Sequence, residues 1–94
     1  MKWNLDDIPV FLAIIERGGI SAAANTLGMP KSTVSTTLTR LEQDLGLRLI
    51  DRSSRSLRIT AEGEVFYRQA QQIMEQALAT DSLMADLGSV AKGR

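Results

Sequence analysis

The 94 residues of this chain suffice for one small domain with a limited hydrophobic core, and they include no Cys and no His. Disulfides, metal sites built from Cys or His, and catalysis by either residue are therefore excluded, and we expect no metal or cofactor. The formal net charge is zero, but residues 31–58 have a net charge of +3 between two net acidic segments. This basic segment is either a solvated face or a region that meets a phosphate backbone.

The N-terminal sequence leads into Asp6 and Asp7 rather than into an apolar run, so no secretory signal is expected. No apolar stretch approaches the roughly 18 residues that a membrane-spanning helix needs. We therefore expect a soluble, cytoplasmic domain that does not contact a membrane.

A first helix is predicted near the N-terminus, with Asn4 or Asp6 as its N-cap and Pro9 in its first turn. Its buried face is predicted from apolar residues at helical spacing, which are Ile8, Phe11, Leu12 and Ile15. The pair Gly18 and Gly19 is expected to end this helix.

Two further helices are predicted over residues 22–27, with Ser21 as the N-cap, and over residues 31–45. The third helix has a regular apolar stripe, made of Val34, Leu38, Leu41 and Leu45. The spacing Ala24-x3-Gly28-x5-Val34 is typical of a helix-turn-helix. In that motif the small residue lets the helices touch, the glycine forms the turn and the valine packs between them.

The outer face of the third predicted helix is rich in hydroxyl groups. Ser and Thr have poor helix propensity, whereas a plain solvated face usually carries Glu, Lys and Gln. We interpret the face as a DNA-reading surface, because hydroxyl groups can hydrogen-bond base edges or phosphates. The predicted base-reading residues are Lys31, Ser32, Thr33 and Thr36. The residues predicted to contact phosphate or the minor groove are Ser35, Arg40, Arg52 and Arg55, and Ser21 completes the predicted DNA-binding set.

A small β-hairpin is predicted from two short apolar or alternating runs, residues 47–50 and 57–59, on either side of a polar turn. Arg52 and Arg55 flank this turn, where nothing local requires two guanidinium groups. We interpret them as contacts to phosphate or to the minor groove. The alternative is that they form surface ion pairs with Asp51 or Glu42.

Thr60 is the predicted N-cap of a last helix that extends to about Leu87 and ends at Gly88. Along it, a seam with spacings of four and three consists of Phe66, Ala70, Ile73, Ala77, Thr80, Met84 and Leu87. A helix this long projects from a small domain, so we expect a second copy to cover the seam. The predicted dimer interface is Phe66, Ala70, Ile73, Ala77 and Met84. The predicted domains are a DNA-binding domain (1–59), a linker and dimerisation helix (60–88), and a hinge or tail (89–94).

Residues 5–87 resemble the N-terminal DNA-binding region of LysR-type transcriptional regulators. The resemblance is carried by Phe11, Ala23, Ala24, Leu27, Val34, Ser35, Leu41, Glu42, Leu45, Gly46, Leu49, Arg52, Arg55, Thr60 and Gly63. It implies a mainly helical, all-α winged helix-turn-helix with a β-hairpin wing and a long linker helix. It also implies a homodimer with antiparallel linker helices that binds an interrupted palindrome in double-stranded DNA and regulates transcription.

The sequence departs from the family pattern in two ways. Gly19, Lys31 and Thr36 stand where the family often has Ser, Gln and Arg, so no base preference can be transferred. The family also continues into a C-terminal effector-binding domain, through which alone a small-molecule effector would act. The 94 residues are expected to be the isolated DNA-binding portion.

Two other functions are compatible with parts of the sequence. A winged helix that binds only proteins would fit the zero net charge and would show no salt-sensitive affinity for DNA. A small enzyme is disfavoured, because His and Cys are absent and the P-loop pattern fails at Asn25 and Pro30, where it needs glycine.

Overall fold

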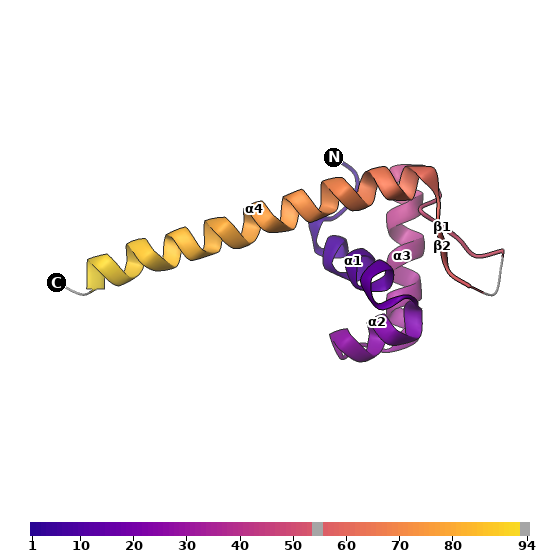
Figure 1. The fold of residues 1–94 in the computed structure, drawn as a ribbon, viewed down its shortest axis with the longest axis horizontal. Helices are drawn as coiled ribbons and strands as arrows, with labels where there is room; N and C mark the ends of the chain where they lie inside the picture. Colours follow the sequence, from indigo (N-terminus) through magenta and orange to yellow (C-terminus); the bar gives the residue numbers. More distant parts are fainter. Residues whose placement is uncertain (54–55, 93–94) are drawn as a thin grey trace.

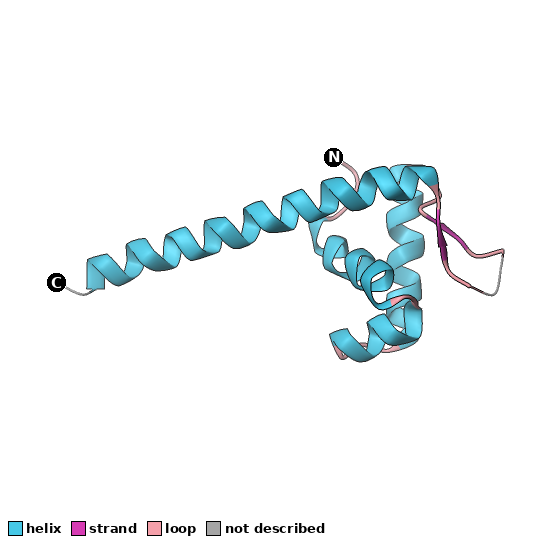
Figure 2. Ribbon diagram, in the orientation of Figure 1, coloured by secondary structure: helices cyan, strands magenta, loops and turns pink. Residues whose placement is uncertain are grey.

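The computed structural model describes residues 1–53 and 56–92, without the side chains of residues 91 and 92. Helices dominate the fold, and a small antiparallel hairpin connects the last two of them along the chain (Figure 2). The elements in chain order are a 3-10 helix η1 (Leu5–Asp7), α1 (Ile8–Arg17), α2 (Ile20–Leu27), α3 (Lys31–Leu45), β1 (Ile50–Asp51), β2 (Arg58–Ile59) and α4 (Ala61–Lys92). This is the predicted winged helix-turn-helix with a long C-terminal helix.

The molecule has a head, formed by α1, α2, α3 and the hairpin, from which most of α4 projects (Figure 1). Its principal extents are 58 × 27 × 19 Å, and the projecting helix accounts for the long axis. No helix of the described residues is both long and apolar enough to cross a lipid bilayer.

Left-handed glycines end the first three α-helices, and the sequence predicted the helix end at Gly18 and the turn at Gly28. Gly18, Gly28 and Gly46 have φ values of 87°, 65° and 70° at the C-caps of α1, α2 and α3. Each donates its backbone N–H to a carbonyl of the preceding turn, which satisfies an acceptor that the helix leaves open. The predicted bounds of α3 are confirmed.

The starts of α1 and α2 differ from the prediction. The side chain of Asn4 caps η1 instead of α1, since its Oδ1 accepts the N–H of Asp6 at 2.9 Å. At the N-cap of α1, Asp7 makes no side-chain cap bond. The helix α2 begins at Ile20 with Gly19 at its N-cap, so the prediction that Ser21 caps it is wrong. The helix starts two residues earlier than predicted, and Gly19 at its N-cap is extended, with φ of 165°.

The hydrophobic core lies between α1, α2 and α3. Its fully buried members include Phe11, Ile14, Ala23, Val34, Leu38 and Leu41. The first turns of α4 cover this core, since the ring of Phe66 makes edge contacts at 5.3 Å with the rings of both Trp3 and Phe11. Ala70 of α4 has no exposed surface at all.

The predicted seam on α4 therefore needs a correction. Phe66 packs on Trp3 and Phe11, and Ala70 is buried, so both already have partners within the chain. Spacing along a helix identifies an apolar face but does not show whether the same chain or a second copy covers it. Further along α4 the apolar side chains are exposed, and these include Leu78, Leu83, Met84, Leu87 and Val90.

The end of α4 was also predicted too early. The helix continues through Gly88 to Lys92, so residues 89–92 are helical rather than a tail; residues 93 and 94 lie outside the described residues. Gly88 is not among the glycines with a positive φ. Glycine ends a helix only where a left-handed turn follows, and within a helix it merely weakens it by about 1 kcal/mol.

The wing strands are shorter than the predicted runs. Ile50 pairs with Ile59 and Asp51 with Arg58, in an antiparallel register. The N-terminus of α4 passes close to β1 at Gly63, where an added Cβ would lie 2.1 Å from the carbonyl oxygen of Leu49 and 2.7 Å from Cγ1 of Ile59. A side chain at this position would push α4 away from the wing.

We predict that Gly63→Ala destabilises the fold by about 2 kcal/mol or more, because a backbone carbonyl cannot move aside without shifting the strand. Thermal unfolding measures the effect. Gly88→Ala is the matched control, since it changes the same residue type in the same helix where nothing lies within 4 Å. It should stabilise the helix by up to about 1 kcal/mol. Equal unfolding temperatures for the two variants would contradict the close packing at Gly63.

Candidate nucleic-acid interface

The first turns of α3 present a polar, solvent-facing surface. Lys31, Ser32, Thr33 and Thr36 are exposed, while Ser35 is half-buried. A shallow groove on this side of α3 is lined by Ser32, Thr33, Thr36, Thr37 and Arg40. The opposite side of the helix is fixed in the core by Val34, Leu38 and Leu41. The structure thus brings Ser32, Thr33 and Thr36 of the predicted base-reading set to one groove, whereas Lys31 is exposed in the first turn but does not line it. The groove also includes Thr37, which was not predicted and is largely buried.

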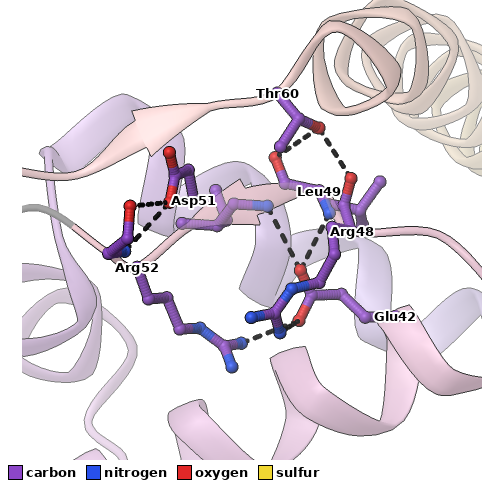
Figure 3. A network of polar contacts seen from close by, with 8 residues as sticks. Glu42, Arg48, Leu49, Asp51, Arg52 and Thr60 are labelled. Atoms are coloured by element: carbon purple, nitrogen blue, oxygen red, sulfur yellow. Dashed lines mark hydrogen bonds and ion pairs between the residues drawn. The ribbon is translucent and has the colours of Figure 1, made fainter.

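The carboxylate of Glu42 attaches the wing to α3. Glu42 is buried, with only 5% of the residue exposed. Its Oε2 accepts the backbone N–H groups of Leu49 at 2.8 Å and of Ile50 at 3.2 Å (Figure 3). Its Oε1 accepts a hydrogen bond from Nη2 of Arg52 at 2.9 Å, and Nη1 of Arg48 lies 3.9 Å away. One side chain of α3 therefore binds both the backbone of the wing and its guanidinium groups.

The sequence analysis left open that Arg52 forms an ion pair with Asp51 or Glu42. In the structure it pairs with Glu42. The pair is not a simple surface contact, because Glu42 is buried while the Arg52 side chain is 33% exposed. Glu42 was not predicted as a site residue. The available signal was its place four residues after Leu38 on the buried stripe of α3, where an acid requires a partner.

Thr60 closes the other side of the same network. Its hydroxyl donates to the carbonyl oxygen of Arg48 at 2.6 Å (Figure 3). The same hydroxyl oxygen accepts the N–H of Gly63 at 2.9 Å. The prediction that Thr60 caps the last helix is confirmed. The same hydroxyl lies 3.2 Å from the carbonyl oxygen of Leu49, so the cap also attaches α4 to the start of the wing.

The turn of the wing begins with Asp51, whose Oδ1 accepts hydrogen bonds from the N–H of Ser53 at 2.9 Å and from its hydroxyl at 2.6 Å. These bonds lower the pKa of Asp51, with a smaller contribution from the nearby charges of Arg58 and Arg48. Ser21 and Arg52, both predicted DNA contacts, line one groove between the start of α2 and the wing. Arg55, the other arginine predicted to contact DNA from the wing, lies outside the described residues.

Arg40 extends from α3 to the N-terminal segment. Its Nη2 lies 2.6 Å from Oδ1 of Asp7 and its Nε lies 3.3 Å from Oδ2, which is a two-pronged contact. The hydrogen bond to Asp7 raises the pKa of Arg40. The sequence analysis placed Arg40 among the phosphate contacts but assigned no role to Asp7.

In the described part of the chain, no group of three acidic, His or Cys side chains could hold a metal ion.

This arrangement of a helix-turn-helix, an arginine-bearing wing and a long helix can be compared with known proteins. Residues 5–64 match the model of a family described as "Bacterial regulatory helix-turn-helix protein, lysR family". The chain belongs to the LysR family. The matched segment contains α1 to α3, the wing and the first turn of α4.

Relatives of this LysR-family chain include regulators and DNA complexes. The HTH-type transcriptional regulator CrgA of Neisseria meningitidis is 37% identical over 93 residues, which are 99% of this chain and 31% of CrgA. A crystal structure of CrgA has a TM-score of 0.79 at 36% identity and covers 95% of this chain and 30% of that one. The BenM DNA-binding domain in complex with catB site 1 DNA has a TM-score of 0.88 at 28% identity, covering 92% of this chain and 97% of that one. The chain spans about a third of the length of its curated relatives.

We predict that Glu42→Ala destabilises the domain by about 3 kcal/mol, because it leaves two buried N–H groups without an acceptor and Arg52 without its partner. Chemical denaturation measures this loss. Gln43→Ala is the neighbouring control at an exposed position of the same helix, and it should change stability by less than about 0.5 kcal/mol. A loss for Glu42→Ala no greater than for the control would mean that the network contributes little.

Proposed function

We propose that this chain binds specific sequences of double-stranded DNA as a homodimer and acts in transcriptional regulation. The observation that carries the proposal is the polar first half of α3, exposed beside an arginine-bearing wing, in a fold similar to that of the BenM domain bound to DNA. A recognition helix enters the major groove by its N-terminal residues. In the first turns of α3, Lys31, Ser32, Thr33 and Thr36 are exposed and therefore available for such contact.

The residues divide into two proposed roles. Lys31, Ser32, Thr33 and Thr36 read base edges, since hydroxyl groups and an ammonium group can bond to them and a Thr methyl group can meet that of thymine. Backbone phosphates or the minor groove are contacted by Ser21, Ser35, Arg40, Arg52 and Arg55. The ion pair with Glu42 fixes the position of the Arg52 guanidinium group as well as compensating the acid.

The proposed dimer forms through the projecting part of α4. The residues left for the interface are Ala77 and Met84 of the predicted set, together with Leu83, Leu87 and Val90, all exposed in the single chain. Ile73 is half-buried at the edge of the head. A helix of 32 residues is about 48 Å long. Antiparallel packing of two such helices could separate two recognition helices by about one turn of DNA, roughly 34 Å. The target would then be an interrupted palindrome.

A small-molecule effector, under this proposal, acts through sequence that the longer relatives contain and these 94 residues do not. The competing proposal is a winged helix that binds only proteins. The pairing of Arg40 and Arg52 with buried acids and the zero net charge favour it. Salt dependence separates the two functions.

We predict that affinity for a selected duplex falls steeply as salt concentration rises, because bound phosphates release counterions. Arg52→Gln removes one charge but keeps an N–H donor for Glu42, and it should flatten the slope of log affinity against log salt by about one unit. Arg68→Gln, an equal charge change at an exposed position of α4, is the control and should leave the slope unchanged. Absence of salt-sensitive affinity for any duplex would favour the protein-binding alternative.

We predict that Met84→Asp converts a dimer into monomers that bind a single half-site weakly, because the variant would bury a charge between the two helices. Met84 is 51% exposed in the single chain, so its replacement leaves the head intact. Sedimentation measures the oligomeric state. Ser82→Asp places the same charge two residues away on another side of α4 and should remain dimeric. A monomeric unmodified chain, with and without DNA, would contradict the dimer.

A further inference from the structure

Asp7 is a buried acid in the N-terminal segment, far in sequence from the candidate interface. Its side chain is only 3% exposed, although it lies at the junction of η1 and α1. The position is fixed by Asn4, whose carbonyl oxygen accepts the N–H of Asp7 at 3.0 Å and whose side chain caps η1. Burying a carboxylate in this way is unfavourable unless a cation and hydrogen bonds compensate it.

The compensating cation is Arg40, which also belongs to the interface side of α3. Two of its N–H groups, on Nε and Nη2, are directed at the two oxygens of Asp7. A guanidinium group has five N–H donors, so this contact leaves three others. The Arg40 side chain is 52% exposed and lines the groove with Ser32, Thr33, Thr36 and Thr37.

This geometry has a consequence for binding. A free arginine loses about 2 kcal/mol of rotamer entropy when it is immobilised. Because Asp7 holds one edge of the guanidinium group, that ordering occurs when the chain folds. The other edge remains at the rim of the groove for an acceptor that arrives later.

We propose that Asp7 is a positioning residue for DNA binding, which holds Arg40 so that its remaining N–H groups bind a backbone phosphate beside the groove of α3. The proposal rests on the proposed DNA-binding function. It differs from a purely structural tie between η1 and α3, which would leave affinity for DNA unchanged. It also differs from charge neutralisation, in which Asp7 weakens the attraction of Arg40 for phosphate.

Asp7→Asn separates these three roles by the direction of its effect. It keeps the size of the side chain and removes the charge that orients Arg40. If Asp7 positions Arg40, affinity for a selected duplex falls by about tenfold, since an arginine must then be ordered on binding, while the salt slope is retained. Unchanged affinity would overturn the proposal in favour of a structural tie, and increased affinity would overturn it in favour of charge neutralisation.

Asp6→Asn is the matched control, because it makes the same chemical change at the exposed neighbouring position. It should not weaken binding. Circular dichroism and thermal unfolding define a temperature at which every variant is folded, and affinities are compared there. A wild-type chain that binds no duplex would refute the proposed function itself, which is a different outcome from equal binding by wild type and Asp7→Asn.

A double-variant cycle gives a second readout that does not depend on the stability of one variant. Arg40→Gln should weaken binding and flatten the salt slope by about one unit. In the Arg40→Gln background, Asp7→Asn should cause no further loss, because Asp7 acts on DNA only through Arg40. A full additional tenfold loss in that background would show that Asp7 acts by another route.

Discussion

The carboxylate of Glu42 is the group on which the position of the wing depends. It lies on the buried stripe of α3, where an acid must be compensated, and its partners are two consecutive backbone N–H groups at the start of the wing and the guanidinium group of Arg52. Within the described residues, the strands themselves pair over Ile50–Asp51 and Arg58–Ile59 alone. So short a hairpin has little stability of its own, and its placement follows from this attachment.

The same region attaches α4 to the head. Thr60 bonds to the carbonyl oxygen of Arg48 and caps α4, and Gly63 allows that helix to pass against Leu49. Phe66 then packs on Trp3 and Phe11. The direction in which α4 leaves the head is therefore fixed at several points, so the proposed dimer would hold α3 and the wing in a defined orientation.

Arg40 and Arg52 each pair with a buried acid, and both pairs include a residue of α3. Asp7 holds Arg40 at the outer groove of α3, and Glu42 holds Arg52 at the wing. These pairs reduce the net positive charge of the region but restrict where two guanidinium groups can lie. Under the proposed function, DNA contact depends on directed donors rather than on a large excess of positive charge.

The sequence by itself determined the order and type of the elements. Apolar spacing identified α1 and α3, the glycines Gly18, Gly28 and Gly46 identified the ends of the first three α-helices, and Thr60 identified the start of α4. It also placed the four base-reading candidates at exposed positions in the first turns of α3, because helical spacing is a local property. Their role remains a proposal.

Only the tertiary structure decided which partners those residues meet. Spacing on α4 could not separate Phe66 and Ala70, which the head covers, from Met84, which it leaves exposed. Nor could sequence show that Arg40 meets Asp7, 33 residues away, or that Gly88 continues a helix instead of ending it. Each of these outcomes depends on contacts between segments distant in the chain, or on a backbone conformation that glycine permits without requiring.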